Sequence, residues 1–191
     1  MQTDSVRVIT APTVEPVTAA ECKLDARVDN TVEDSLFAMW IAAARQEIEM
    51  VARRSLITRT LEVTMDAWPA DGWLCLPYPP LLTVTQVTYY DAANAAVTWP
   101  ADQYIVIADQ EPGVIMPATG LWWPSGLHAW PRIRVRYTAG YGATAAAVPD
   151  YYKQDIRGLV KLQYDFRSGW TPEAERARAM IYAHAEMDRG W

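Results

Sequence analysis

In the first third of the chain, apolar residues recur at the spacing of a helix. Over residues 31–54 they recur every three or four positions, which is typical of an amphipathic helix. These positions are Leu36, Trp40, Ile41, Ala44, Ile48 and Val51. Asn30 or Thr31 is expected to cap this helix. A shorter helix is predicted over residues 18–28, because a Thr and a Glu three residues later open it with the spacing of a capping box.

The middle of the chain has strand-like spacing. From Thr58 to Asp66 every second residue is apolar, and a short apolar run at Leu74–Leu76 precedes a proline-rich turn. Proline cannot donate a ladder hydrogen bond, so the chain must leave the sheet there. It returns as a longer strand at Leu82–Tyr90, with apolar residues on both faces: Leu81, Val87 and Tyr89 on one, Leu82, Val84 and Tyr90 on the other. Further strands are predicted at residues 104–108, 114–116 and 132–137.

Helical spacing resumes near the C-terminus. Pro149 suits the first position of a helix, and Thr171-Pro172-Glu173 caps a last one that ends near Met187. The predicted fold class is α+β, with a small helical bundle and a β-rich insertion between the N-terminal and C-terminal helices. We expect a single domain of residues 1–191. Its helices lie at about 18–54 and 149–188, its insertion at about 56–138, and a C-terminal arm starts at about 169.

Composition narrows the class of protein. The formal net charge is −6, whereas proteins that read DNA sequence carry a basic face. Nine Trp and ten Tyr against two Phe is an unusual ratio, and Trp and Tyr are favoured at protein interfaces. The first residues form no signal peptide, and no apolar run is long enough to span a bilayer. We therefore expect a soluble cytoplasmic protein whose two cysteines, Cys22 and Cys75, are reduced and buried.

The sequence contains no recognisable catalytic or cofactor-binding motif. It lacks a phosphate-binding Gly-Lys-Ser/Thr loop, a dinucleotide glycine pattern, a paired-histidine metal helix and a Gly-x-Ser-x-Gly elbow. The two histidines are His128 and His184, and His184 could share a helical face with Asp188. A solvated pair explains that spacing better than a metal or proton-transfer site. We expect no enzymatic activity, no cofactor and no metal.

Three surfaces remain as candidates for binding. Arg132, Arg134 and Arg136 point to one side of a strand, where they could grip phosphates or an acidic neighbour, or pair across the sheet with residues such as Glu62. A second cluster is formed by Trp122, Trp123 and Trp130. It could stack on sugars, form an interface, or fold onto the sheet. The apolar stripe of residues 31–54 is assigned to core packing against the C-terminal helix.

Several short motifs, in order, resemble one protein family. They are Val14-Glu15-Pro16-Val17-Thr18, Ile41-Ala42-Ala43-Ala44-Arg45, Leu56-Ile57-Thr58, Leu76-Pro77 with Pro79-Pro80-Leu81, Val84-Thr85-Gln86-Val87-Thr88-Tyr89, Tyr137-Thr138-Ala139-Gly140-Tyr141-Gly142 and Val148-Pro149. Over about residues 9–167 the chain is similar to the head–tail connector (adaptor) family of tailed bacteriophages and phage-derived gene-transfer particles. It departs from the family at Arg53-Arg54-Ser55, where a glycine-containing helix end is expected.

The resemblance implies a structural role. Members of the family form a homo-oligomeric ring, usually dodecameric, beneath the portal protein. They extend the channel through which double-stranded DNA passes without sequence recognition, and they provide the surface for the stopper or tail-completion protein. The expected location is the neck of a virion or virion-like particle, assembled in the bacterial cytoplasm, with no membrane contact. An acidic wall would let DNA slide. The alternative function is an aromatic-rich glycan-binding module of a particle.

Within this role, two surfaces receive specific predictions. Arg132, Arg134 and Arg136, with Trp122, Trp123 and Trp130, are predicted to form the inter-subunit interface. The arm after residue 168 is predicted to dock on the portal through Arg176, Arg178, Ile181, Arg189 and Trp191, because its apolar stripe is thin and Trp191 is a large anchor. The alternative for this arm is a helix that folds back onto the domain.

Overall fold

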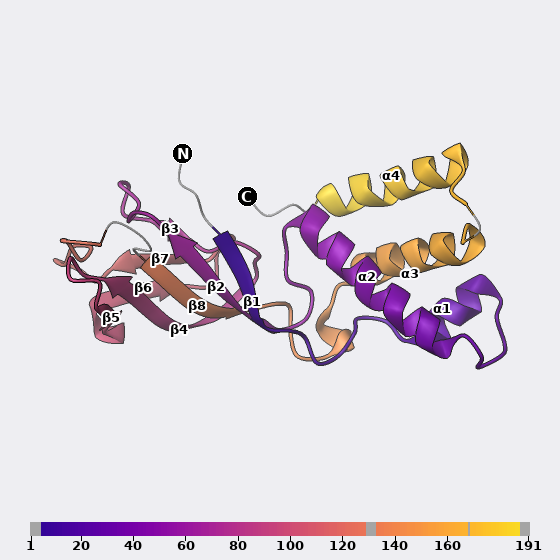
Figure 1. Cartoon of the computed structure of the whole chain (residues 1–191), viewed down its shortest axis with the longest axis horizontal. Coiled ribbons are helices and arrows are strands. Elements are labelled where there is room, and N and C mark those ends of the chain that lie inside the picture. Colours follow the sequence, from indigo (N-terminus) through magenta and orange to yellow (C-terminus); the bar gives the residue numbers. More distant parts are fainter. Residues whose placement is uncertain (1–4, 129–132, 168, 188–191) are drawn as a thin grey trace. The chain divides into compact units, whose positions relative to one another are not determined.

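The computed structural model of the chain describes residues 5–128, 133–167 and 169–187, and it is an α+β fold (Figure 1). The described residues form two compact units. Of these residues, one unit comprises 5–11 and 58–140, and the other comprises 12–57 and 141–187, apart from the gaps just given. The β-rich insertion is therefore confirmed. That the whole chain acts as a single connector domain stays a prediction.

The first unit, which we call the β unit, contains two antiparallel sheets. The five-stranded sheet has the order β1-β2-β8-β4-β5 and the three-stranded sheet the order β3-β7-β6. The strands are β1 (Ser5–Thr10), β2 (Arg59–Met65), β3 (Leu74–Cys75), β4 (Leu81–Tyr90), β5 (Ala96–Trp99), β6 (Tyr104–Ile107), β7 (Val114–Pro117) and β8 (Ile133–Ala139), with a 3-10 turn at Ala101–Gln103. The chain leaves the sheet at the predicted prolines, between β3 and β4.

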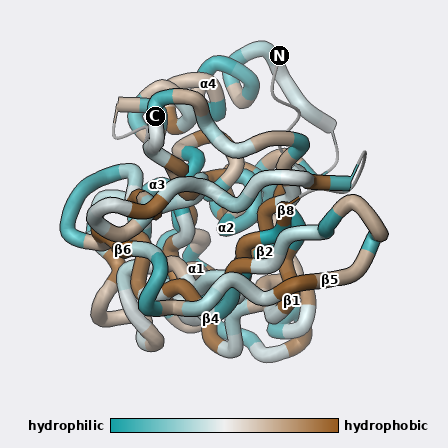
Figure 2. Tube along the Cα trace, turned by 90° about the vertical axis from the view of Figure 1, so that its left-hand side faces the viewer, coloured by the Kyte–Doolittle hydropathy of each residue, from teal (hydrophilic) through white to brown (hydrophobic). Residues whose placement is uncertain are grey.

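One hydrophobic core contains residues of both sheets. Val63 and Val135 from the large sheet and Ile115 from the small one are fully buried in it. Tyr137 of β8 is also fully buried, and its hydroxyl donates a hydrogen bond of 2.6 Å to the carbonyl of Pro77. Along β8, buried residues alternate with half-buried ones, and Figure 2 colours the strands by hydropathy. Polar side chains of the large sheet therefore gather on its other face, which we call the outer face.

The prediction for the faces of β4 was partly wrong because β4 is bulged. Its pairing with β8 slips between Val84 and Gln86, so Val84 lies opposite Tyr137 and Val87 lies opposite Val135. An extra residue in one strand reverses the alternation beyond it. Val84 and Val87 therefore face the same core, and Leu82 is exposed instead of covered.

The second unit, the helical unit, contains four α-helices. They are α1 (Ala19–Ala26), α2 (Asp34–Ala52), α3 (Asp150–Asp165) and α4 (Pro172–Glu186), with a 3-10 turn at Ala145–Ala147. The capping box at Thr18 and Glu21 is present. The longer helix begins later than predicted, at Asp34, because the Asn30 side chain instead accepts a hydrogen bond from the Val32 amide in the turn before it.

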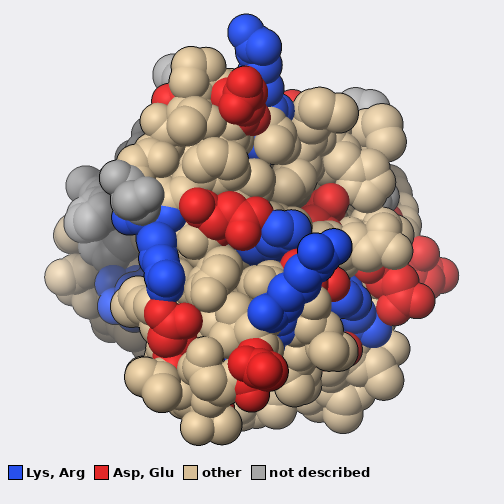
Figure 3. Space-filling model, turned by 90° about the vertical axis from the view of Figure 1, so that its right-hand side faces the viewer, with Lys and Arg blue, Asp and Glu red and all other residues tan. Residues whose placement is uncertain are grey.

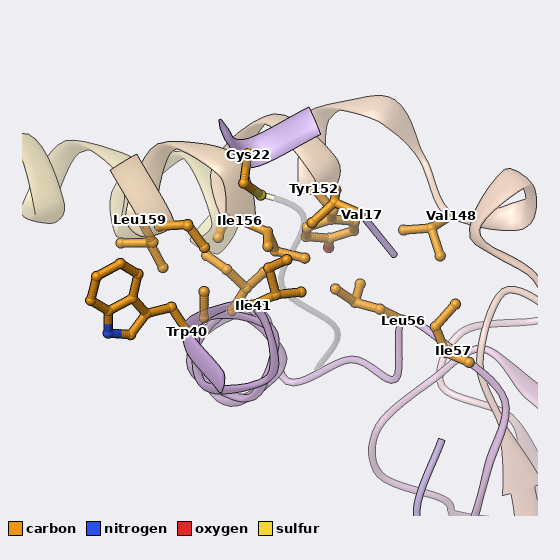
Figure 4. Packing of buried hydrophobic residues seen from close by; sticks show 14 of the residues in the cluster. Val17, Cys22, Trp40, Ile41, Leu56, Ile57, Val148, Tyr152, Ile156 and Leu159 are labelled. Carbon is orange, nitrogen blue, oxygen red and sulfur yellow. The ribbon is translucent and has the colours of Figure 1, made fainter. Parts of the chain in front are cut away.

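The predicted stripe of α2 is the core of the helical unit. Trp40, Ile41 and their neighbours pack against Ile156 and Leu159 of α3, as Figure 4 shows. Phe37 stacks on Tyr164 with ring centroids 5.5 Å apart. At the end of α2, Arg53 has φ 52° and ψ 40°. This is the left-handed conformation that favours glycine, which explains why a glycine was expected there.

Candidate interaction surfaces

A row of polar side chains crosses the outer face of the large sheet. Strand register places Arg7, Glu62, Arg136 and Gln86 opposite one another on four adjacent strands. Glu62 accepts hydrogen bonds from Arg7 at 2.9 Å and from Arg136 at 2.7 Å. Burial raises the pKa of Glu62, but hydrogen bonds and charge from Arg136 and Arg7 outweigh it and leave that pKa below its usual value. The cross-strand pair of Arg136 with Glu62 is thus confirmed.

On the same face, among the residues of the paired strands, positively charged side chains outnumber negatively charged ones. Arg134 lies over the ring of Tyr90, with its guanidinium carbon 5.3 Å from the ring centroid. The side chains of Arg7 and Arg136 are 69% and 41% exposed, whereas that of Glu62 is 8% exposed. Arg132 lies outside the described residues. Three arginines thus face one buried glutamate, on a chain whose net charge is −6.

The tryptophan cluster divides into a packed and an exposed part. Trp123 stacks on Trp68 with centroids 4.6 Å apart, so this part of the loop is folded onto the β unit. Trp122 is 88% exposed. Together with Trp73 and Leu121, both tryptophans of the loop line a pocket of about 390 Å³. Trp130 lies outside the described residues.

The C-terminal helix folds back onto the helical unit. Ala174 and Ala185 are fully buried, and Ile181 packs against the core beside Gly158, where a Cβ would stand 3.0 Å from the Ile181 side chain. The arm therefore does not point away from the core. The apolar stripe is thin, as predicted, but small residues let α4 approach α2 and α3 closely.

Polar contacts also hold α4 in place. Arg178 donates hydrogen bonds of 2.9 Å to Glu47 of α2 and 2.6 Å to the hydroxyl of Tyr182. Of the predicted docking residues, Arg178 and Ile181 are thus engaged within the unit, and Arg176 is exposed. Arg189 and Trp191 lie outside the described residues. Portal docking by these five residues stays a prediction.

His184 of α4 contacts Asp155 of α3. Its Nδ1 atom lies 2.9 Å from both carboxylate oxygens of Asp155, whereas Asp188 lies outside the described residues. Burial raises the pKa of Asp155, and the hydrogen bond and charge of His184 oppose that shift only in part. This pair joins α3 to α4.

Possible metal ligands, membrane-spanning helices, cysteines and surface charge complete the candidate features. The described residues offer no candidate for a metal site. Among the described residues, no group of three or more His, Cys, Asp and Glu side chains could hold a metal ion. None of the described helices is long and apolar enough to cross a membrane. Cys22 is buried as expected, but Cys75 is exposed, because it follows the inward-facing Leu74 on a two-residue strand. In Figure 3, cations and acids lie interleaved on the visible face and form no patch of one sign.

Comparison with known proteins gives a structural likeness only. No protein-family model matches the chain, and no curated protein matches it. Among solved structures it is similar to a chain of the virion of a native gene transfer agent (GTA) particle, with 23% identity and a TM-score of 0.76, covering 97% of this chain and 95% of that one. A chain in the neck of an empty GTA particle computed with C6 symmetry has 23% identity and a TM-score of 0.78, with coverage of 98% and 96%. A chain in the neck of a native GTA particle computed with C12 symmetry has 24% identity and a TM-score of 0.76, with the same coverage. The fold is therefore shared along nearly the whole length of both chains.

Proposed function

We propose that this protein is a non-enzymatic structural component of the neck of a phage or gene-transfer particle. In this proposal it forms a homo-oligomeric ring beneath the portal protein, extends the DNA channel, and joins the head to the stopper or tail-completion protein. The observation that carries the proposal is the structural likeness, which covers both units and at least 95% of each compared chain. A ring of twelve copies is the stoichiometry we favour.

The charge distribution supports this role. A channel wall must not trap DNA, and in a chain with net charge −6 the acidic side chains that repel phosphates outnumber the basic ones. The arginines of the outer sheet face, Arg7, Arg134 and Arg136, are assigned to an acidic surface of a neighbouring subunit or ring. The exposed Trp122 is assigned to the same inter-subunit interface, since large exposed aromatic side chains are favoured there.

The proposal predicts an association that depends on the portal. Neighbours in a ring meet through two different patches, and here the portal is proposed to act as the template that closes the ring. The purified chain should be predominantly monomeric by mass photometry at micromolar concentration. It should sediment with portal rings encoded by the same genome. Stable rings of the chain alone, or no sedimentation with the portal, would contradict the proposal.

A glycan-binding module is the second candidate. It is favoured by the pocket of about 390 Å³ beside the 88% exposed Trp122, since an exposed indole face can stack on a sugar ring. A carbohydrate array separates the two functions. Binding that is lost in Trp122→Ala would support the module, and no binding by the wild-type chain would remove it.

A further inference from the structure

The pocket beside Trp122, which we call the aromatic pocket, combines indole rings with one carboxylate. Trp73, Trp122 and Trp123 line it, and its volume is about 390 Å³. Asp71 is the one charged residue among the described residues that line it. Trp122 is 88% exposed, and Asp71 is exposed as well. Indole faces attract cations, and the planar guanidinium of arginine can both stack on an indole and pair with a carboxylate.

The region around the pocket carries no cation of its own. Between Arg59 and Arg132 the sequence contains no Lys or Arg, although the whole chain has 17 of them. The same stretch contains seven Asp and Glu residues. Asp71 accepts a hydrogen bond of 3.1 Å from the Trp73 amide in its own turn, and it has no ion pair among the described residues. A cation for this carboxylate must therefore come from elsewhere.

The helical unit shows how such a set of groups holds an arginine. Arg178 lies over the rings of Trp170 and Tyr182, with its guanidinium carbon 5.4 Å and 5.2 Å from their centroids. The same guanidinium donates a hydrogen bond of 2.9 Å to the carboxylate of Glu47. An indole and a carboxylate thus hold one arginine together in this chain. The aromatic pocket offers the same two kinds of group to an arginine of another molecule.

The outer face of the large sheet supplies a suitable arginine. Arg7 lies on the edge strand β1, and its side chain is 69% exposed. Glu62 accepts one hydrogen bond from Arg7 and two from Arg136. A guanidinium carries five N–H donors, so Glu62 orients Arg7 without using all of its donors. Among the arginines of this face, Arg7 is therefore the one best placed to reach a neighbouring molecule.

The aromatic pocket and the outer face belong to different parts of the β unit. The pocket is formed by segments that flank β3 and β7 of the small sheet. The outer face is the side of the large sheet that is turned away from the core shared with the small sheet. One patch is acidic and aromatic, and the other carries exposed arginines. Neighbours in a ring meet through two such different patches.

We propose that Arg7 of one copy enters the aromatic pocket of the next copy, where it stacks on Trp122 and pairs with Asp71. The inference rests on the ring proposed above and names one of its subunit contacts. Charge complementarity selects a second copy as the partner, since each copy carries both patches. Exposed ion pairs are individually weak, so this contact does not hold free copies together. It becomes effective when the portal aligns neighbouring copies.

Three substitutions test the contact through the occupancy of portal rings, measured by sedimentation. Arg7→Ala, Asp71→Asn and Trp122→Ala should each lower the occupancy at least about tenfold, because every copy makes the contact on both of its sides. Asparagine keeps an oxygen that can accept the Trp73 amide, and all three chains should melt within a few degrees of wild type. Asp102→Asn is the matched control, because it removes the same charge from an exposed residue outside the pocket, and its occupancy should be unchanged.

The double variant Arg7→Ala with Asp71→Asn shows whether these two residues meet. If they do, the second substitution has little left to remove, and the double variant should fall no further than the more affected single variant. Losses that multiply in the double variant would overturn the proposal, and so would an Asp102→Asn loss as large as that of Asp71→Asn. A loss in Trp122→Ala alone would also overturn it, since the pocket would then hold another group.

The same measurements separate this inference from the proposed function. If wild-type chains form no ring on the portal, the proposed function fails and this contact with it. If they form rings and Arg7→Ala fills portal rings normally, only the contact is wrong.

Discussion

Glu49 provides the sharpest test of the buried ion pair that it forms with Arg45 on α2. It is 1% exposed, and its carboxylate accepts hydrogen bonds of 2.8 Å from Arg45 and 2.9 Å from the backbone amide of Leu56. Arg45 also contacts Glu15 at 2.7 Å. Glu49→Ala removes one partner of a buried ion pair and leaves the Leu56 amide without this acceptor.

The expected cost follows from these contacts. Removing one partner of a buried ion pair costs about 3–5 kcal/mol, because the other charge stays buried. Arg45 keeps Glu15, whose side chain is 31% exposed, so the lower end of that range applies. A loss of about 3 kcal/mol corresponds to a melting temperature about 6–12 °C lower for a chain of this length.

Thermal melts followed by circular dichroism measure this change. Gln46→Ala is the matched control, because Gln46 is exposed on the same helix, and it should melt within about 2 °C of wild type. Replacing both partners, as Arg45→Met with Glu49→Leu, should restore part of the lost stability, since no unpaired arginine remains. If Glu49→Ala melts as the control does, the buried pair does not stabilise the helical unit and the reasoning is refuted.

Three further predictions concern the other surfaces. Arg134→Glu should leave the melting temperature of the monomer within a few degrees yet reduce ring formation on the portal, and normal ring formation would count against the contact. Truncation after residue 168 removes the folded-back α4 and should lower the melting temperature, as differential scanning calorimetry would show; an unchanged value would mean that α4 does not contribute to the fold. The hydrogen bond from Arg157 lowers the pKa of Asp25, so this pair stabilises the fold above pH about 4 and is lost as pH falls through the lowered pKa. At neutral pH, Arg157→Met should therefore be less stable than wild type by under about 1 kcal/mol. In thermal melts at acid pH this difference in stability should become smaller, and a difference that does not depend on pH would contradict the prediction.

The sequence predicted the elements whose spacing is regular. The stripe of α2, the capping box at Thr18 and the alternation of β2 and β8 are local patterns. Each element formed close to where it was expected, although α2 begins later, at Asp34. The strand β1 at Ser5–Thr10 was missed, although Val6 and Val8 alternate with polar residues there. Its partner β2 lies more than fifty residues away along the chain, and no local pattern identifies such a pairing.

The candidate surfaces were less predictable because they depend on distant contacts. Spacing showed that Arg134 and Arg136 face outward, but only the register of four strands brings Arg7 and Glu62 beside Arg136. The position of α4 was decided by packing, since its own apolar stripe is thin and Gly158 on α3 makes room for it. The bulge in β4 likewise arises from pairing and reversed the faces expected from alternation.

Cryo-electron microscopy of the full chain co-expressed with the portal protein of the same genome tests the central claim most directly. The account predicts one ring of this chain, coaxial with the portal and continuous with its channel, with each copy in contact with the next. Bare portal rings, or copies bound singly without contact between neighbours, would contradict it.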